Sequence, residues 1–344
     1  MNPNYFRKGF TDPSLHEAFI QAVTDGDCAE IAAVVQAARI ERLPADAMIL
    51  GMPRAMAANS RALNDSSLHT APEFGTADYL EGLELIHELA GMRDRPLSDN
   101  DDSLPEGYRV VSPWLADTEV LKYPSGVDFG GNAQSHAEIQ SGRIQEAIDT
   151  DDYTLIETGR DAASFVHSDN PITPWLRLAE DAIADGAALK MGASVQTKLP
   201  GQSNFVTYGF PFVLGVLGKA LEQAGYLSFT LKWRDFAPRP EESSPVLNKG
   251  YLTVAYPEGS PMHCSDPAMH SMAACVAKHV LLKLLDGSHV FEETGRSLKQ
   301  EAELLADNVG YFRVHAGVHF PWEHTHADAR AAVLAEEICR AYQL

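Results

Sequence analysis

The stretch Asp266-Pro267-Ala268-Met269-His270 predicts where a long helix begins. Aspartate favours the N-cap because its carboxylate accepts hydrogen bonds from free amides, and proline favours the first helical position because it has no N–H. Apolar residues then follow at helical spacing: Val276, Val280 and Leu284. We therefore expect a helix over 266–285. Its unpaired first-turn amides offer an anion site beside His270, although the same features also fit a purely structural helix.

Helical spacing of apolar residues extends over much of the rest of the chain. Further helices are expected near 18–23, 31–38, 78–91, 134–148, 174–190, 211–226, 298–316 and 327–342. Strand-like alternation is scarce, and prolines and glycines make 94–132 the longest irregular stretch. The expected fold class is therefore all-α, a helical bundle. Residues 1–150 would form the N-terminal helical part of the domain, and 151–344 the bundle that carries the anion site.

The composition of the chain disfavours nucleic-acid binding, membrane spans and cysteine-based zinc sites. The 344 residues include 48 Asp and Glu against 27 Lys and Arg, a net charge of −21, which disfavours nucleic-acid partners. No apolar run approaches the ~20 residues of a membrane span, and no signal peptide is visible, so the expected location is cytoplasmic, with export left open. The cysteines show neither zinc-finger spacing nor a disulfide framework: Cys28, Cys264, Cys275 and Cys339.

A second informative stretch runs from Lys232 to Pro240. Lys232 and Arg239 are seven residues apart, about two helical turns, so on one helix both cations would leave the same face. Pro238 and Pro240 would end the helix there. The pair could converge on one anion, or it could be a solvated basic helix end.

A third stretch contains Arg313, His315, His319 and Glu323. His319 and Glu323 are four residues apart, so in helical geometry the carboxylate could accept a proton from one ring nitrogen and leave the other free for a ligand. His315 and His319 share the spacing of a zinc motif. However, Ala316 stands where that motif requires glutamate, so zinc is disfavoured.

Taken in order, these stretches resemble the signature of the vanadium-dependent haloperoxidases and the related type 2 phosphatidic acid phosphatases. The first motif, lysine, six residues and Arg-Pro, is complete in Lys232, Arg239 and Pro240, and the third keeps Arg313 and His319 at the same interval. Runs at 205–211, 258–263, 305–308 and 316–319 are similar to the algal bromoperoxidase branch. The middle motif departs, because Ala268-Met269 replaces Ser-Gly before the histidine.

The resemblance implies a helical bundle with vanadate in a deep site. His319 would bind the metal through a ring nitrogen, and Glu323 would orient the His319 ring. The vanadate oxygens would be neutralised by three cationic side chains and would accept a hydrogen bond from the main-chain amide of Met269. The cations are Lys232, Arg239 and Arg313.

By the same resemblance, His270 would be the acid and base, and Lys232 would polarise hydrogen peroxide for attack by halide. His263 stands where bromoperoxidases carry histidine, which favours bromide or iodide. The product, hypohalous acid, would halogenate a small organic substrate, and a homo-oligomer is expected.

Two other functions remain open at the level of sequence. One is an acid phosphatase of the same superfamily, with His319 as the nucleophile that forms phosphohistidine and His270 protonating the leaving group. The other is a degenerate homologue with altered chemistry, which the Ala268-Met269 departure favours.

Overall fold

The computed structural model describes most of the chain from residue 76 onward. The described residues are 18, 21, 72, 76–98, 100–140, 148–168, 172–190, 209–235, 237–243, 251–261, 263–342 and 344. Of the helical runs expected at 18–23 and 31–38, only Ala18 and Gln21 are described, and both are helical. The similar run at 205–211 is described from residue 209 onward.

The expected all-α class is confirmed. Helices dominate the described residues: α6 (Ala77–Met92), α7 (Glu106–Arg109), α8 (Pro113–Ala116), α9 (Ala133–Gln140), α10 (Gly159–Ser168), α11 (Thr173–Ala184), α12 (Phe210–Asp235), α13 (Pro240–Ser243), α14 (Met269–Leu284), α15 (Leu298–His315) and α16 (Pro321–Ala341). Two short strands, β1 (Val120–Leu121) and β2 (Tyr153–Thr154), pair in antiparallel register, Val120 opposite Thr154.

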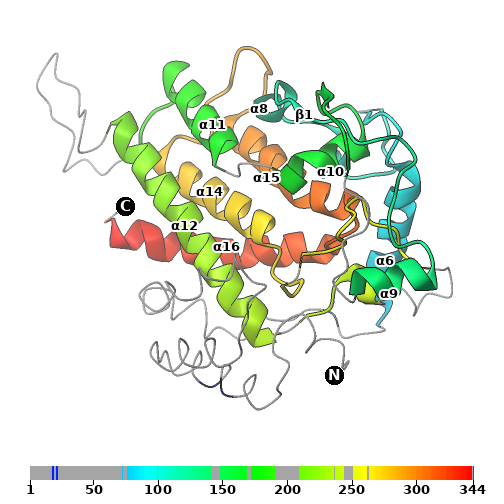
Figure 1. Ribbon diagram of the computed structural model, residues 1–344. Helices are drawn as coiled ribbons and strands as arrows, with labels where there is room; N and C mark the ends of the chain where they lie inside the picture. Colours follow the sequence, from blue (N-terminus) through cyan, green and yellow to red (C-terminus); the bar gives the residue numbers. More distant parts are fainter. Residues whose placement is uncertain are drawn as a thin grey trace, which may run out of the picture.

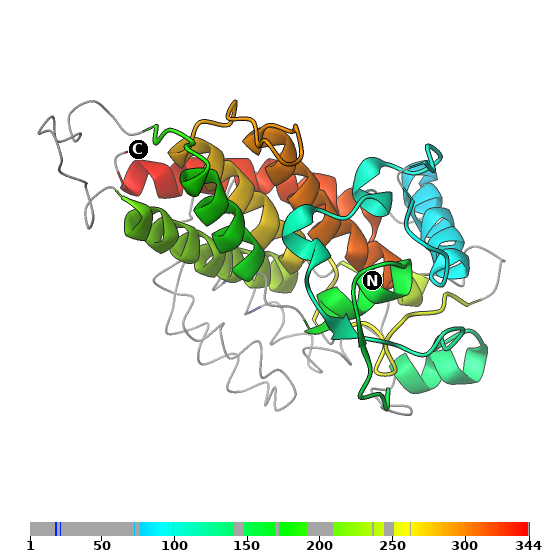
Figure 2. The same ribbon diagram turned by 90° about the horizontal axis from the view of Figure 1, so that it is seen from above.

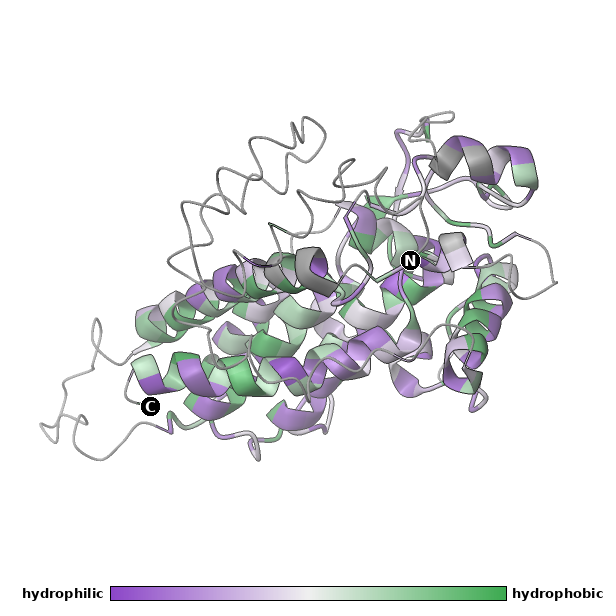
Figure 3. Cartoon of the chain, turned by 90° about the horizontal axis from the view of Figure 1, so that it is seen from below, coloured by the Kyte–Doolittle hydropathy of each residue, from purple (hydrophilic) through white to green (hydrophobic). Residues whose placement is uncertain are grey.

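Helix α14 forms the centre of the bundle. It packs against α12, α15 and α16, and Figure 1 shows it between α12 and α15 with α16 crossing the group. Its residues are buried around most of its circumference, as expected for a helix enclosed by neighbours. Ala273, Ala274 and Ala277 are small, so the adjacent helices can approach closely. The outer helices carry both hydrophobic and hydrophilic residues (Figure 3), as expected for helices with one face toward the core and one toward solvent.

Helix α15 brings one site residue into the interior. It begins with a capping box, because the Gln300 amide donates to Ser297 Oγ at 3.3 Å and the Ser297 amide donates to Gln300 Oε1 at 2.9 Å. This fixes the start of the helix, whose buried face includes Arg313 near the other end. Helix α10 packs along α15, so the ends of both helices approach the same region.

Several expected helix limits shift in the structure. Helix α14 begins at Met269, not at residue 266, and α16 begins at Pro321, six residues before the expected 327. Helix α11 ends at Ala184, α9 is described only to Gln140, and residues 148–150 are not helical. The reason for the α16 difference is Pro321, which suits the first helical position and so extends the helix toward the site.

The stretch 94–132, expected to be irregular, contains two one-turn helices, α7 and α8, and strand β1. Seen from above, α6 and α9 lie at one end of the bundle and the C-terminus lies at the other (Figure 2).

Within the described parts of the chain, no helix combines the length and apolar character needed to cross a bilayer. Cys264, Cys275 and Cys339 are free thiols, and Cys28 lies outside the described residues. The division near residue 150 stays a prediction.

Candidate anion-binding site

A partly open cavity of about 280 Å³ lies where α10, α12, α14 and α15 meet the segment before α16. It gathers residues from stretches that are far apart in the sequence: Val166, His167, Phe229, Tyr256, Glu258, Pro261, His263, Met269, His270, Arg313 and His319. His263, Met269, His270, Arg313 and His319 are the site candidates among them, and Lys232, Arg239 and Glu323 lie around the cavity without lining it.

The beginning of α14 faces this cavity through Met269 and His270. Ala268, not Asp266, is the N-cap residue, and no side chain caps the first turn. Asp266 instead accepts two hydrogen bonds from Arg330, at 2.8 and 2.7 Å, and precedes Pro267 through a cis peptide bond. The expectation that Asp266 caps the helix is therefore wrong, because its carboxylate is taken by a buried arginine. The uncapped amides still carry the positive end of the helix dipole.

Lys232 lies on the last turn of α12 and is fully buried. Its ammonium donates to the carbonyl oxygens of Cys264 and Ser265, both at 2.7 Å. These bonds tie the end of α12 to the segment that leads into α14. Burial, together with the nearby Arg239 charge, lowers the pKa of Lys232 well below its ordinary value.

Arg239 approaches the same segment from beyond the end of α12. The helix stops at Asp235, so Lys232 and Arg239 do not share a helix face as the spacing suggested. Pro238 and Pro240 cause the difference, since the residue before a proline avoids helical geometry. The Arg239 guanidinium donates to the His263 carbonyl at 3.0 Å and to the Val318 carbonyl at 2.7 Å.

Arg313 reaches the cavity from α15 with only 4% of its surface exposed. Its Nη1 donates to the Val166 carbonyl at 2.6 Å and to the Tyr256 hydroxyl at 3.3 Å, and its guanidinium carbon lies 5.6 Å from the centre of the Tyr256 ring. The buried Nε has no hydrogen-bond partner among the described residues. A buried donor without an acceptor is costly, which favours an anion beside it.

His319 is held from both sides. Nδ1 is in short hydrogen-bond contact with the Glu323 carboxyl, although His319 precedes α16 and only Glu323 is helical. Arg239 Nη1 lies 3.0 Å from Nε2 and can only donate. Nε2 must therefore be the unprotonated nitrogen, and Nδ1 carries the proton and donates it to Glu323. The ring thus presents a lone pair toward the cations, as a metal ligand requires.

Burial sets the protonation of this pair. It lowers the pKa of His319 well below its ordinary value, with the Arg239 and Lys232 charges acting in the same direction. Burial also raises the pKa of Glu323 to about 8. His319 is therefore a neutral imidazole at physiological pH.

His263 and His270 complete the expected set. His263 Nδ1 lies 3.0 Å from Arg239 Nη2, and its ring meets Phe229 edge-on at 5.2 Å. Burial and the neighbouring cations, Lys232 first, lower the pKa of His263 well below its ordinary value. His270, in the first turn of α14, lines the cavity wall.

Charge balance distinguishes this cavity from the rest of the interior. Neither Lys232 nor Arg313 forms an ion pair with a carboxylate among the described residues, whereas Arg330 is paired with Asp266. Buried charges are almost always paired, so two uncompensated cations leave a deficit of negative charge. The orphaned Arg313 Nε adds a donor position, whereas the His319 lone pair already accepts a hydrogen bond from Arg239. These residues fit an oxyanion such as vanadate.

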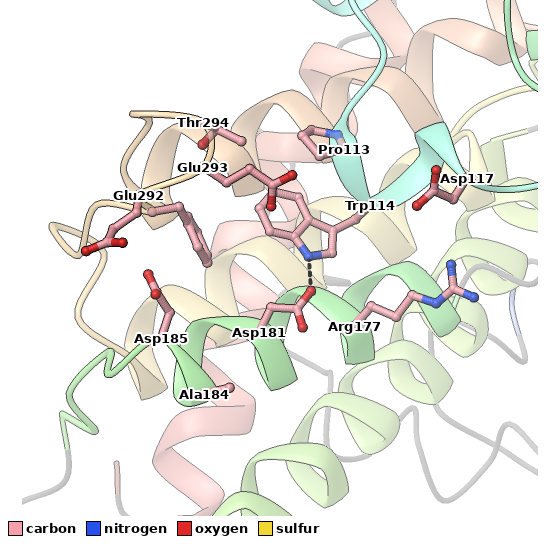
Figure 4. A pocket seen from close by; sticks show the side chains of 11 residues that line it. Pro113, Trp114, Asp117, Arg177, Asp181, Ala184, Asp185, Glu292, Glu293 and Thr294 are labelled. Carbon is pink, nitrogen blue, oxygen red and sulfur yellow. Dashed lines mark hydrogen bonds between the residues drawn. The ribbon is translucent and has the colours of Figure 1, made fainter.

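A second hollow, of about 800 Å³, has the opposite character. Carboxylates surround it, with one arginine among them, and Trp114 donates to Asp181 at 2.8 Å (Figure 4). Its acidic residues are Asp117, Asp181, Asp185, Glu292 and Glu293. This lining repels oxyanions and contributes nothing to the proposed site.

His315, which shares a four-residue spacing with His319, lies outside the cavity. His315 Nε2 donates to the Tyr108 carbonyl at 3.1 Å and does not line the cavity, so it does not join His319 in a zinc site. Phe229, Tyr256, His167 and Glu258 line the cavity but were not singled out as site residues. Only Glu258 lies in a run that is similar to the algal bromoperoxidases, 258–263, and the others carry no local pattern that would reveal them.

Comparison with known proteins adds evidence on the fold. Neither a protein-family model nor a curated protein matches this sequence. Its fold is shared with a known bromoperoxidase. That protein is the second vanadate-dependent bromoperoxidase from Ascophyllum nodosum, described as homohexameric, with a TM-score of 0.61 at 14% identity. The match covers 78% of this chain and 66% of that chain. A bacterial vanadium-dependent iodoperoxidase gives 0.44 at 12% identity, over 79% of this chain and 51% of that chain. The first likeness establishes a related helical fold.

Proposed function

We propose that this protein is a vanadium-dependent haloperoxidase, which oxidises halide with hydrogen peroxide to hypohalous acid. The observation that carries the proposal is the uncompensated positive charge of Lys232 and Arg313 beside a cavity into which His319 presents a neutral ring. A shared fold with a vanadate-dependent bromoperoxidase supports the choice of oxyanion.

The residues around the cavity would bind vanadate in two ways, by coordinating the metal and by neutralising its oxygens. His319 Nε2 would hold the vanadium in place of its hydrogen bond from Arg239, and Glu323 fixes the tautomer that leaves this nitrogen unprotonated. Lys232, Arg239 and Arg313 would neutralise the oxygens, with the Met269 amide as a further donor. Bound vanadate would activate peroxide as a Lewis acid without changing its own oxidation state.

Two further histidines, His270 and His263, would act on peroxide and on halide. His270, on the cavity wall, would exchange protons with peroxide and water. His263 would lie beside the halide, where a ring kept neutral by burial and by the nearby cations leaves the positive charge to Lys232 and Arg239. A cavity of about 280 Å³ admits peroxide and halide but is smaller than most drug-sized ligand sites, so bulky organic substrates would react at or beyond its mouth.

Assembly belongs to the same proposal. The bromoperoxidase of similar fold is homohexameric, and we infer that this chain also forms a homo-oligomer. Sedimentation equilibrium would measure the assembled mass, and a monomer at micromolar concentration would contradict the inference.

The test of the function is reconstitution with orthovanadate. We expect vanadate-dependent halogenation of a phenolic dye with peroxide and bromide or iodide, and loss of that activity in His319→Ala. The matched control is His279→Ala, since His279 is bonded to Asp328 at 2.8 Å and is not among the residues that line the cavity. Hydrolysis of an aryl phosphate without halogenation would instead indicate a phosphatase, and silence in both assays would indicate altered chemistry.

A further inference from the structure

Met269 places a thioether sulfur on the wall of the cavity in which the oxidant would form. It is the first residue of α14, and its partly buried side chain lines the cavity together with His263, His270 and Arg313. Among the described residues that line this cavity, Met269 alone carries sulfur. The resemblance leads us to expect glycine at this position, and glycine has no side chain to oxidise.

The position of this sulfur distinguishes it from the other sulfur atoms nearby. Thioethers are readily oxidised to sulfoxides, and their susceptibility follows their exposure to the oxidant. Met272, three residues further along α14, is completely buried and does not line the cavity. Cys264 is a partly buried free thiol that does not line the cavity either. An oxidant formed inside the cavity would therefore meet the Met269 sulfur first.

A sulfoxide at this position would change the surroundings of the oxyanion. Met269 packs against the main hydrophobic core, and oxidation converts its apolar side chain into a larger, polar one. The sulfoxide oxygen accepts hydrogen bonds, and the Arg313 Nε beside the same cavity has no partner among the described residues. A sulfoxide would therefore compete with the oxyanion for space and for a charged donor.

We propose that Met269 is oxidised to methionine sulfoxide by hypohalous acid formed in this cavity, and that the sulfoxide weakens vanadate binding. The inference rests on the proposed function. Overall, the oxygen–halogen bond breaks and a sulfur–oxygen bond forms. The sulfur is oxidised by two electrons, the halogen leaves as halide with that electron pair, and the hydroxyl proton goes to water. The enzyme thus limits its own number of turnovers.

The first experiment uses the protein without vanadate. Hypobromite is added as a reagent, tandem mass spectrometry assigns the oxidised residues, and isothermal titration calorimetry measures the affinity for orthovanadate. We expect sulfoxide at Met269 before Met272 and about tenfold weaker vanadate binding. Treated Met269→Leu should keep the affinity of its own untreated form, and the matched control Met272→Leu should respond like wild type. An equal loss of affinity in treated Met269→Leu overturns the proposal.

The second experiment tests whether the oxidant acts before it leaves the cavity. The vanadate-loaded protein turns over peroxide and bromide in the presence of excess free methionine, which consumes oxidant released into solution. Met269 should still be oxidised, whereas Met92, a partly buried residue of α6 that does not line the cavity, should stay intact. Hypobromite added to the same mixture without peroxide should oxidise neither residue. Equal oxidation of Met269 and Met92 during turnover overturns the proposal.

The remaining outcomes separate this proposal from the proposed function. Wild-type halogenation that leaves Met269 unoxidised over many turnovers overturns the self-oxidation alone. Oxidation at the same rate with peroxide and no bromide overturns hypohalous acid as the oxidant. A vanadate-loaded protein that does not halogenate overturns the proposed function and the self-oxidation with it, while the vanadate-free experiment still decides whether the sulfoxide weakens oxyanion binding.

Discussion

Two groups of buried cations in this molecule have different surroundings. In the first, Arg93 and Arg160 share Asp128, at 2.8 and 3.0 Å, and Arg160 also bonds Asp94 at 2.5 Å. In the second, around the cavity beside His319, the cations bond mainly to carbonyl oxygens and imidazoles. The first group is neutralised by the protein itself. The second leaves positive charge for something the chain does not supply, and that difference separates a structural cluster from a binding site.

The largest expected effect comes from breaking the neutralised cluster. Asp128→Asn removes the carboxylate shared by two buried arginines, and we expect a loss of about 3 kcal/mol in unfolding free energy. Vanadate affinity should not change, because the cluster does not line the cavity. Urea denaturation and vanadate titration measure the two quantities. A weakened affinity in a folded variant would mean that the two groups are not independent.

The converse change should affect binding more than stability. Arg313→Met removes an uncompensated buried charge, so we expect the unfolding free energy to stay within about 1 kcal/mol of wild type. Vanadate affinity should fall roughly 100-fold, since a charged hydrogen-bond donor to the oxyanion is lost. Isothermal titration calorimetry provides the dissociation constant. The control is Arg340→Met, because Arg340 lies on the surface beside Glu337.

The neutralised cluster should also affect acid stability through its neighbour His315. Burial lowers the pKa of His315 from 6.5 to about 4, with the Arg93 charge acting in the same direction. The unfolded chain therefore binds more protons than the folded one between these values. Stability is complete above pH 6.5 and falls as the pH drops toward 4, by about 1 kcal/mol from pH 6 to pH 5. Denaturation of His315→Gln should lack this part of the slope, and an unchanged slope would assign it to other groups.

The smallest expected effect concerns the cavity itself. Ala268→Ser restores the hydroxyl that the resemblance leads us to expect at this position, and we predict three- to tenfold tighter vanadate binding, about the free energy of one hydrogen bond. Ala268→Gly adds no hydroxyl and is the matched control. Equal affinity in the serine variant and wild type would mean that residue 268 does not face the oxyanion.

The sequence predicts the helical class and most helix positions, because amphipathic spacing is a local signal. It also singles out residues that lie around one cavity, although their roles stay predictions. It fails where a distant partner decides the outcome. Asp266 has the pattern of a helix cap, yet Arg330, 64 residues away, takes its carboxylate.

His167 is the clearest example of what sequence reasoning misses. Its partners Tyr123 and Glu258 are 44 and 91 residues away, and no spacing rule links the three. Only the packing of α10 against α15 and of the 254–258 segment beside it brings them together. Arg239 shows a milder case, since it reaches the segment bonded by Lys232 from beyond the end of α12 and not along one helix face.

The bonds that hold Lys232 and Arg239 end largely on main-chain oxygens of residues 263–265 and 318. Every amino acid supplies such an oxygen, so the side chains of Cys264, Ser265 and Val318 can be exchanged during evolution without releasing the two cations. A site anchored to the backbone can therefore keep its shape while its sequence drifts.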